Sequence, residues 1–157
     1  LDKAAVEDRL RTDLGIERLL WLGDGLANDH TDGHIDNLAR FVGPNHILVP
    51  SSAGPGDPNQ AVFEDARARA EAFGCKVTLM PSVGRFEQDR EIVPASYMNF
   101  YIGNRAVVVP IYGSVNDDAA IEVLANIYPE RDVIGVMADA VLTGGGSFHC
   151  SSQQVPI

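Results

Sequence analysis

The chain has 157 residues, of which 45% are hydrophobic and 22% charged, a balance typical of one globular domain with a buried core. Its 22 acidic and 12 basic residues give a formal net charge of −10. This charge disfavours nucleic acid and anionic membranes as partners, because both are bound by clustered Lys and Arg. It is compatible with a small cationic substrate, which an acidic protein attracts at long range.

The cysteine content and the hydropathy narrow the class of protein. Two cysteines, Cys75 and Cys150, do not make a disulfide framework, so we expect a cytoplasmic protein. No apolar run approaches the length of a membrane span, and no signal peptide is recognisable. Because the chain starts at Leu1 and opens directly into an amphipathic pattern, we expect it to be part of a longer polypeptide.

Apolar periodicity and turn residues predict alternating helices and strands. The first half opens with a helix from Ala4 to Leu14, with Val6, Leu10 and Leu14 on one stripe, followed by a short strand from Arg18 to Leu22 and a loop from Gly23 to Thr31. Two strands then lie on either side of Gly43-Pro44-Asn45, within Ile35 to Pro50. A helix from Pro58 to Phe73, with Val62, Ala66, Ala70 and Phe73 inward, leads to a strand from Lys76 to Met80. A polar stretch from Gly84 to Pro94 follows, which is long enough for a functional loop.

The order of elements then recurs, which predicts a repeat of hairpin, helix and strand. The second copy comprises strands at Asn99 to Ile102 and Ala106 to Val109, a helix from about Asp117 to Tyr128 and a strand from Val133 to Val136. Pro50 and Pro110 occupy the same place in the two copies. In a radial arrangement, the segments that follow each closing strand face a common axis, so His34 and Cys150 are expected to converge.

The stretch Gly144-Gly145-Gly146-Ser147-Phe148-His149-Cys150 carries the first chemical signal. Three glycines let the backbone turn or lie close to a ligand, and Cys150 follows the last of them after three residues. A thiol in such a place is a candidate nucleophile, since the reactive thiolate needs access and nearby positive charge. The alternative reading is a small buried hydrophobic residue beside a loop.

The run Thr31-Asp32-Gly33-His34-Ile35-Asp36-Asn37 carries the second signal. If Ile35 begins a strand, then His34 and Asp36 point to the same face. An imidazole beside a carboxylate is a general base with its orienting group, or a base beside a cation-binding group. A hydrogen-bonded pair at a strand end, without catalysis, is the structural alternative.

Four segments together resemble the agmatine deiminase family, which includes the bacterial type of peptidylarginine deiminase. They are Trp21-Leu22, the run Asn28 to Phe41, the segment Pro94 to Ile102, and Gly144 to Cys150 followed by Gln153-Gln154. The resemblance covers nearly the whole chain, with the motifs in the same order. It implies an α/β fold that is part of a five-module α/β propeller, with residues 1–157 as the C-terminal portion of one deiminase catalytic domain.

The resemblance also implies a reaction, the hydrolysis of a guanidinium group to a ureido group with release of ammonia. Cys150 matches the family nucleophile, His34 the general acid/base, and Asp36 one of two carboxylates that clamp the guanidinium. Paired carboxylates suit the forked N–H donors of this planar cation. The implied substrate is agmatine, and no metal or organic cofactor is required.

Two departures from the family pattern affect these expectations. The second clamping carboxylate belongs to an N-terminal half that this chain lacks, which makes that half an expected partner. Relatives commonly carry an acidic residue where this sequence has His30, which bears on substrate recognition.

Secondary site candidates are Asp32, Asn37, Gly144 and Gly145 for substrate binding, with Asp29 as a further loop acid. We expect Asn99 and Tyr97 to serve the core or a hairpin, and His149 to point away from Cys150 if that segment is extended. Cys75 is expected to be structural, and His46 has no visible partner in the sequence.

Three alternatives remain at this point. The first is deimination of arginine in peptides, which needs an open groove. The second is a non-catalytic chain that binds a partner, because exposed strand edges and an apolar face demand pairing, whether with the missing half or with further copies of itself. A cysteine amidase or peptidase is disfavoured, since the sequence offers no obvious side-chain oxyanion donor.

Overall fold

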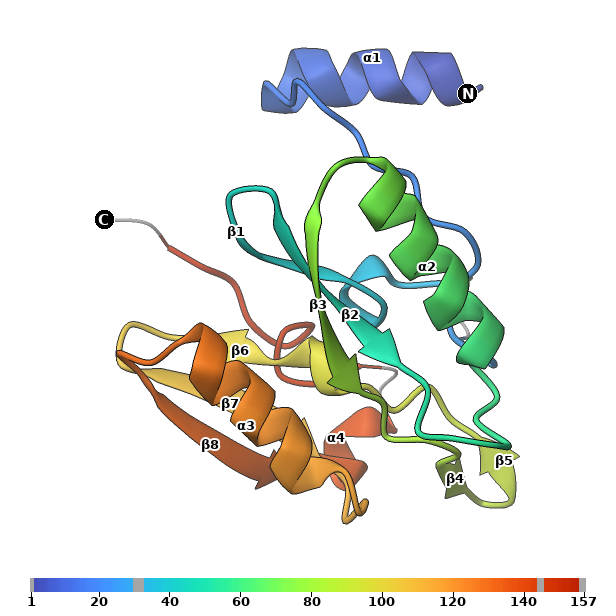
Figure 1. Ribbon diagram of the computed structural model, residues 1–157, viewed down its shortest axis with the longest axis vertical. Helices are drawn as coiled ribbons and strands as arrows, with labels where there is room; N and C mark the ends of the chain where they lie inside the picture. Colours follow the sequence, from blue (N-terminus) through green and yellow to red (C-terminus); the bar gives the residue numbers. More distant parts are fainter. Residues whose placement is uncertain (1, 30–32, 144–145, 156–157) are drawn as a thin grey trace.

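The computed structural model describes residues 2–29, 33–143 and 146–155, and shows two copies of one α/β module (Figure 1). The first comprises a 3-10 helix η1 (Ile35–Asn37), β1 (Arg40–Gly43), β2 (His46–Ser51), α2 (Gln60–Ala72) and β3 (Lys76–Pro81). The second comprises η2 (Tyr97–Asn99), β6 (Tyr101–Ile102), β7 (Ala106–Ile111), α3 (Asp117–Ile127) and β8 (Asp132–Met137). The predicted repeat of hairpin, helix and strand is therefore confirmed.

Both modules have the same sheet topology. Their strand orders are β1-β2-β3 and β6-β7-β8, with an antiparallel first pair and a parallel second pair joined through the helix. Pro50 and Pro110 are each the fifth residue of the central strand, as the sequence predicts. The antiparallel ladders extend only to Leu48 and Val108, so neither proline is needed as a backbone donor toward the short outer strand.

The core follows from residue alternation along the central strand of the first module. Ile47 and Val49 pack with Phe63, Ala66 and Ala70 of α2, where every third or fourth residue faces the sheet. Leu48 points to the opposite face and joins the core of the second module. Since β2 is buried on both faces, it lies between two hydrophobic clusters and contributes to each.

The predicted inward face of α2 is confirmed for Val62, Ala66 and Ala70, which pack in the core of the first module, but it omitted Phe63 and included Phe73. Phe63 is buried together with Ala66 and Ala70, whereas Val62 is half-buried. Phe73 lies at the C-cap, partly exposed, with the guanidinium of Arg18 over its ring at 4.3 Å.

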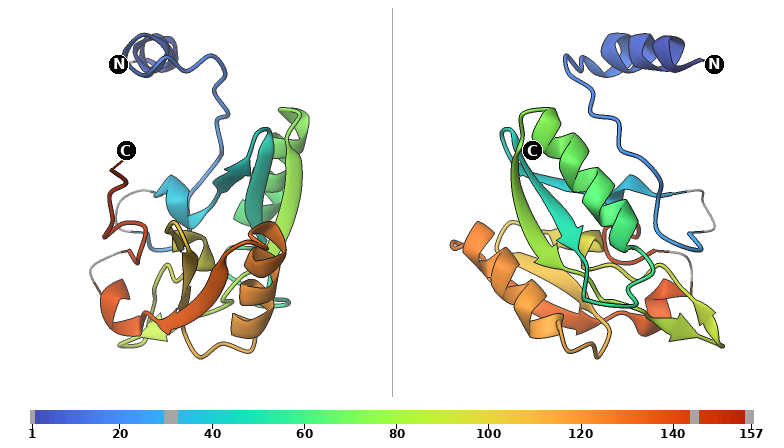
Figure 2. Two further views of the ribbon diagram at one scale, coloured as in Figure 1. Left: turned by 90° about the vertical axis from the view of Figure 1, so that its left-hand side faces the viewer. Right: turned by 45° about the vertical axis from the view of Figure 1, so that its right-hand side comes forward.

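The first helix stands away from the two sheets in every view (Figures 1 and 2). This helix, α1 (Lys3–Leu14), buries no residue, begins with an Asp2 side-chain cap and ends at Gly15 in the left-handed conformation. Trp21 meets it, donating from Nε1 to Glu7 at 2.7 Å. The predicted strand from Arg18 to Leu22 is wrong, because this segment has no strand partner and runs as extended coil.

Three further boundaries differ from the sequence predictions. The polar stretch from Gly84 to Pro94 contains a small antiparallel pair, β4 (Glu87–Gln88) and β5 (Glu91–Ile92). Ile35 begins η1 rather than a strand, and the segment around Asn99 is the 3-10 helix η2 before a shorter strand. A last short helix, α4 (Asp139–Leu142), follows β8.

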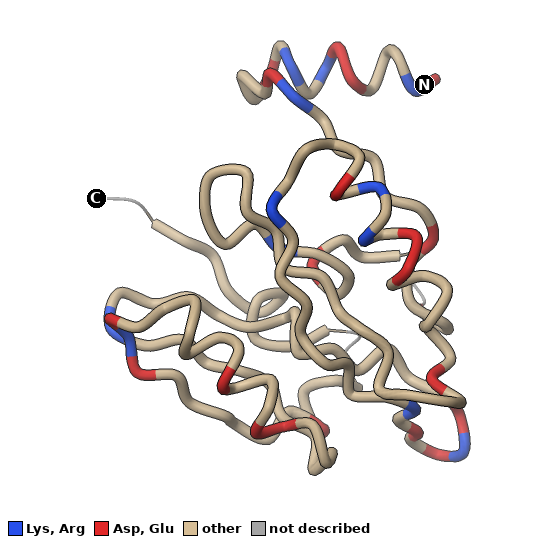
Figure 3. The backbone as a smooth tube through the Cα atoms, in the orientation of Figure 1, with Lys and Arg blue, Asp and Glu red and all other residues tan. Residues whose placement is uncertain are grey.

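Charged residues are distributed over the outer elements (Figure 3). Basic and acidic side chains alternate along α1 and α2, with ion pairs such as Arg9–Asp13 and Arg69–Asp65 at helical spacing. None of the helices within the described ranges is long and apolar enough to cross a membrane.

Candidate active site

Three irregular turns meet on the side of the sheets opposite α2 and α3 (Figure 2). They are η1, η2 and the turn formed by residues 147–151, in which the amide of Ser151 donates to the carbonyl of Ser147 at 3.1 Å. The first two occupy equivalent places at the start of each module, and the third follows the second module. The expected convergence of these segments is confirmed.

The turns bring together the three side chains predicted to do the chemistry. One ligand-type atom each of His34, Asp36 and Cys150 lies within 4.8 Å of the other two. The Cys150 thiol donates to Oδ2 of Asp36 at 3.1 Å. The sequence predicts that His34 and Asp36 lie together because they share one face of a strand. This reason is wrong, since the two residues lie in and next to the 3-10 helix η1.

Asp29 and Gly33 fix the segment that carries His34. Asp29 is buried and its Oδ2 accepts from the backbone amide of His34 at 2.9 Å, so this acid acts on the backbone. Gly33 has φ +108°, and a Cβ there would come within 2.9 Å of Gly25 Cα, so both the conformation and the close approach require glycine. The ring atom Nδ1 of His34 is buried, with no hydrogen-bond partner among the described residues.

Asn99, for which the sequence predicts a core or hairpin role, lies at the centre of the site. Its Oδ1 accepts from the backbone amides of Ser147, His149 and Cys150 at 3.0, 3.1 and 3.2 Å. Its Nδ2 lies 3.0 Å from Cys150 Sγ, 3.1 Å from Asp36 Oδ2 and 3.0 Å from Asn37 Oδ1. One buried amide thus holds the turn that carries the thiol and orients the thiol toward the carboxylate.

The repeat contains a signal that could have identified Asn99. Asn37 ends η1 and Asn99 ends η2, so the two asparagines are equivalent in the two modules. Asn37 is buried and faces Asn99, which makes it a neighbour of the reactive groups through that amide. Its own Nδ2 has no partner among the described residues. Tyr97, by contrast, is a core residue as expected, donating to Asp117 at 2.6 Å.

His149 corrects a second prediction. The segment is a turn rather than a strand, so His149 and Cys150 reach the same carboxylate. Its Nδ1 lies 2.6 Å from Asp36 Oδ2. The predicted extended geometry would have sent the imidazole to the opposite side.

Glycine is required beside the thiol for a steric reason. A Cβ on Gly146 would lie 2.7 Å from both Cβ and Sγ of Cys150, closer than non-bonded carbon and sulfur atoms approach. The third glycine of the triplet therefore makes room for the cysteine. The predicted substrate-binding residues Asp32, Gly144 and Gly145 lie outside the described residues, as does His30.

The electrostatics of the site favour a neutral thiol beside an ionised carboxylate. Burial raises the pKa of the Cys150 thiol, the Asn99 amide opposes this, and the Asp36 carboxylate raises it further. Burial would also raise the pKa of Asp36, but hydrogen bonds from His149 and then Cys150 hold it below its ordinary value. The resting pair is therefore a thiol that donates to a carboxylate.

Arg40 supplies a cation behind this pair. Its guanidinium stacks on Phe100 at 4.6 Å and donates to the carbonyls of Met98 and Phe100. Burial lowers the pKa of Arg40, while Asp36 acts in the opposite direction. An arginine remains charged in such surroundings.

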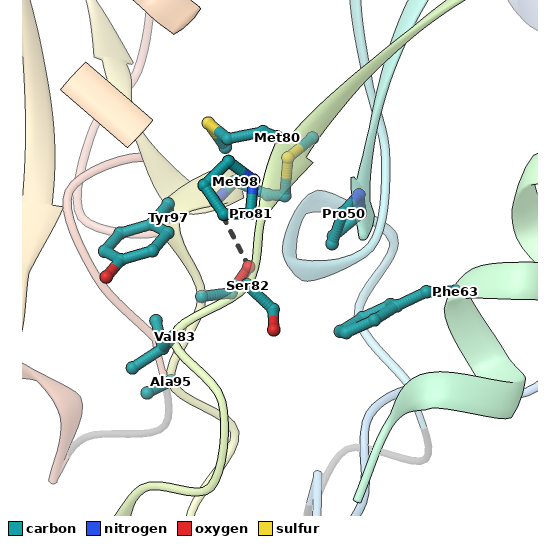
Figure 4. Close-up of a pocket in the computed structure, with 10 residues that line it drawn as sticks. Pro50, Phe63, Met80, Pro81, Ser82, Val83, Ala95, Tyr97 and Met98 are labelled. Carbon is teal, nitrogen blue, oxygen red and sulfur yellow. Dashed lines mark hydrogen bonds between the residues drawn. The ribbon is translucent and has the colours of Figure 1, made fainter. Parts of the chain in front are cut away.

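A small void lies away from the site. A void of about 10 Å³ between the modules is lined by Pro50, Phe63, Met80 and Tyr97 among others, and is no larger than a single water needs (Figure 4). None of the side chains gathered around Cys150 lines it.

The site also contains ligand types that Zn²⁺ accepts, namely the side chains of Cys150, His34 and Asp36. These three form a possible metal-binding cluster among the described residues.

The two remaining singled-out residues lie away from the thiol. Cys75 is a free thiol packed against the core of the first module, which agrees with a structural role. His46 does have a partner, since its Nε2 lies 2.8 Å from the Thr78 hydroxyl on the neighbouring strand.

Known proteins with similar sequence and structure share this arrangement of modules. A Vibrio parahaemolyticus protein assigned as an agmatine deiminase is 34% identical over an alignment that covers 99% of this chain and 50% of that protein. The solved structure of a Porphyromonas gingivalis protein assigned as an arginine deiminase has a TM-score of 0.90 at 34% identity, covering 99% of this chain and 48% of that one. Agmatine deiminase of Enterococcus faecalis has a TM-score of 0.86 at 32% identity, with 95% and 47% covered.

The chain thus spans about half the length of the relatives it matches. The family model described as Porphyromonas-type peptidyl-arginine deiminase matches residues 1–156. This match covers almost every residue, including the three turns that form the site, so the chain belongs to the Porphyromonas-type peptidyl-arginine deiminase family.

Proposed function

We propose that the protein hydrolyses a guanidinium group to a ureido group and ammonia through a covalent intermediate on Cys150. The observation that carries this proposal is the meeting of a thiol, an imidazole and a carboxylate from segments more than 100 residues apart. The family membership and the agmatine deiminase relatives support the same chemistry. Agmatine is the proposed substrate and N-carbamoylputrescine the product, a step toward putrescine.

In the first half of the reaction, Asp36 binds the N–H groups of the cationic substrate. The positive charge offsets the carboxylate that otherwise favours the protonated thiol, and the thiol gives its proton to His34. Sγ then forms a bond to the central guanidinium carbon. The C–N bond of one terminal nitrogen breaks, and His34 delivers the proton with which that nitrogen leaves as ammonia.

In the second half, water attacks the carbon of the thiouronium adduct. His34 takes one proton from this water as the new C–O bond forms. The C–S bond then breaks to release the ureido product and the thiolate, while the second proton of the water goes to solvent. The thiolate recovers its proton from His34, which restores the resting pair. Asn99 donates to Sγ in the resting site, so it can stabilise the thiolate at the start and the end of the cycle. This scheme uses no metal or organic cofactor.

We also propose that residues 1–157 are the C-terminal portion of a single catalytic domain, built as part of a five-module α/β propeller. The relatives are about twice as long, and the two modules described here account for part of such a ring. Helix α1 buries no residue, while Leu14 is 66% exposed. These surfaces suit contact with the remaining half, which would supply the second guanidinium-binding carboxylate.

The test is the formation of ureido product from agmatine by the longest natural polypeptide that contains this sequence. Product that depends on Cys150, and disappears in Cys150→Ser, is the expected result. The same assay with an arginine-containing peptide separates the alternative of peptidylarginine deimination. Turnover of neither substrate would favour the remaining alternative, a non-catalytic chain that pairs with a partner.

A further inference from the structure

The carboxylate of Asp36 is held unequally by its surroundings. Three donors reach Oδ2, namely His149 Nδ1 at 2.6 Å, Asn99 Nδ2 at 3.1 Å and Cys150 Sγ at 3.1 Å. No donor among the described residues is bonded to Oδ1. One oxygen is thus turned toward the protein, while the other is left available.

The shortest of these contacts comes from His149. An ionised carboxylate only accepts hydrogen bonds, so Nδ1 of His149 carries the hydrogen in this contact. Its length of 2.6 Å is that of a charge-assisted hydrogen bond, stronger than a neutral one. Both side chains are largely shielded from solvent, at 32% and 15% exposure, so the contact is only partly screened.

We propose that His149 is a positioning residue for the substrate-binding carboxylate: its Nδ1–H fixes Oδ2 of Asp36 and presents Oδ1 to the guanidinium N–H groups of the substrate. This inference rests on the proposed deiminase function and assigns a role to a residue that touches the carboxylate rather than the reacting carbon.

The need for such a residue is greatest when the thiolate forms. The Cys150 thiol then stops donating to Oδ2, and its negative charge repels the carboxylate across about the same 3.1 Å. His149 and Asn99 are the described donors that remain on Oδ2, and His149 is the closer. It therefore keeps the carboxylate in place while Sγ turns to the substrate carbon.

Two small alkylating reagents measure this role at Cys150. Chloroacetamidine carries the forked N–H groups of a guanidinium, and chloroacetamide is its neutral counterpart. The ratio of their rates, relative to the same ratio for free cysteine, reports recognition of the cation independently of the reactivity of the thiol. We expect a ratio well above that of free cysteine in the unsubstituted protein.

Two substitutions at position 149 separate a donor from a packing role. His149→Asn retains an N–H close to the place of Nδ1, whereas His149→Phe retains the ring and loses the donor. We expect the ratio to fall about tenfold in His149→Phe, to stay within about threefold in His149→Asn, and to be unchanged in the matched control His46→Phe. The rate with chloroacetamide should change less than about threefold throughout.

The inference would be overturned if His149→Phe kept the rate ratio of the unsubstituted protein while His149→Asn lowered it. A ratio equal to that of free cysteine in the unsubstituted protein would instead refute the proposed function. If His149→Phe fails to fold, as judged by circular dichroism, ¹H–¹⁵N NMR of the unsubstituted protein tests the hydrogen bond between His149 and Asp36 directly. A hydrogen on Nδ1 of His149 is expected, and an unprotonated Nδ1 would refute the contact.

Discussion

Replacement of Asp36 by Asn should separate the reactivity of the thiol from catalysis. The carboxylate Oδ2 lies 3.1 Å from Cys150 Sγ and disfavours the thiolate. Even at the dielectric constant of water, two unit charges at this distance repel each other by about 1.3 kcal/mol. Removing this repulsion raises the thiolate fraction near pH 7 about tenfold, because about 1.4 kcal/mol corresponds to a factor of ten.

The alkylation rate should rise less than the thiolate fraction. A less basic thiolate is less nucleophilic, with a Brønsted slope of about 0.4–0.5, so the net gain with iodoacetamide at pH 7 is about threefold. The same variant should lose roughly 100-fold or more in deimination, since the guanidinium loses its charged partner.

The assay uses iodoacetamide and intact-mass detection in a Cys75→Ala background, so that Cys150 is the thiol observed. Cys150→Ser serves as the blank. An alkylation rate that is unchanged or slower in Asp36→Asn would refute the Sγ–Oδ2 contact on which this reasoning rests.

Three further substitutions test the parts of the site separately. Gly146→Ala should reduce turnover about 100-fold with little change in melting temperature, because its Cβ would meet Cys150 at 2.7 Å; normal turnover would contradict the packing. Asn99→Ala should abolish activity and cost about 2–3 kcal/mol in urea unfolding, since the backbone amides of Ser147 and Cys150 lose their acceptor while that of His149 keeps the carbonyl of residue 99; full stability would argue against this network. Tyr97→Phe should cost about 1–2 kcal/mol through its bond to Asp117 while sparing the alkylation of Cys150, and an altered alkylation rate would contradict its purely structural role.

The repeated architecture could be predicted from the sequence because its signals are local. Alternation, turn residues and the matching prolines at positions 50 and 110 define the central strands β2 and β7, which the structure contains within two residues of the predicted bounds. The convergence of His34 and Cys150 followed from the equivalence of their places in the repeat. These features depend on the order of the elements along the chain and on the spacing of the repeat, and both can be read from the sequence alone.

The remaining features depend on tertiary contacts. The segment from Arg18 to Leu22 has the composition of a buried strand but finds no strand beside it, so it stays coil. The turn at residues 147–151 is stabilised by the side chain of Asn99, which lies 48 residues before Ser147 and 51 before Cys150, and this turn decides where His149 points. No local pattern around His149 contains that information.

The most direct test of the account is an intact-mass measurement after acid quenching of the reaction with agmatine. The longest natural polypeptide that contains this chain should show an adduct on Cys150 with the mass of agmatine minus ammonia, and ureido product should accumulate in parallel. Product formation without such an adduct, or undiminished in Cys150→Ser, would contradict covalent catalysis by this thiol.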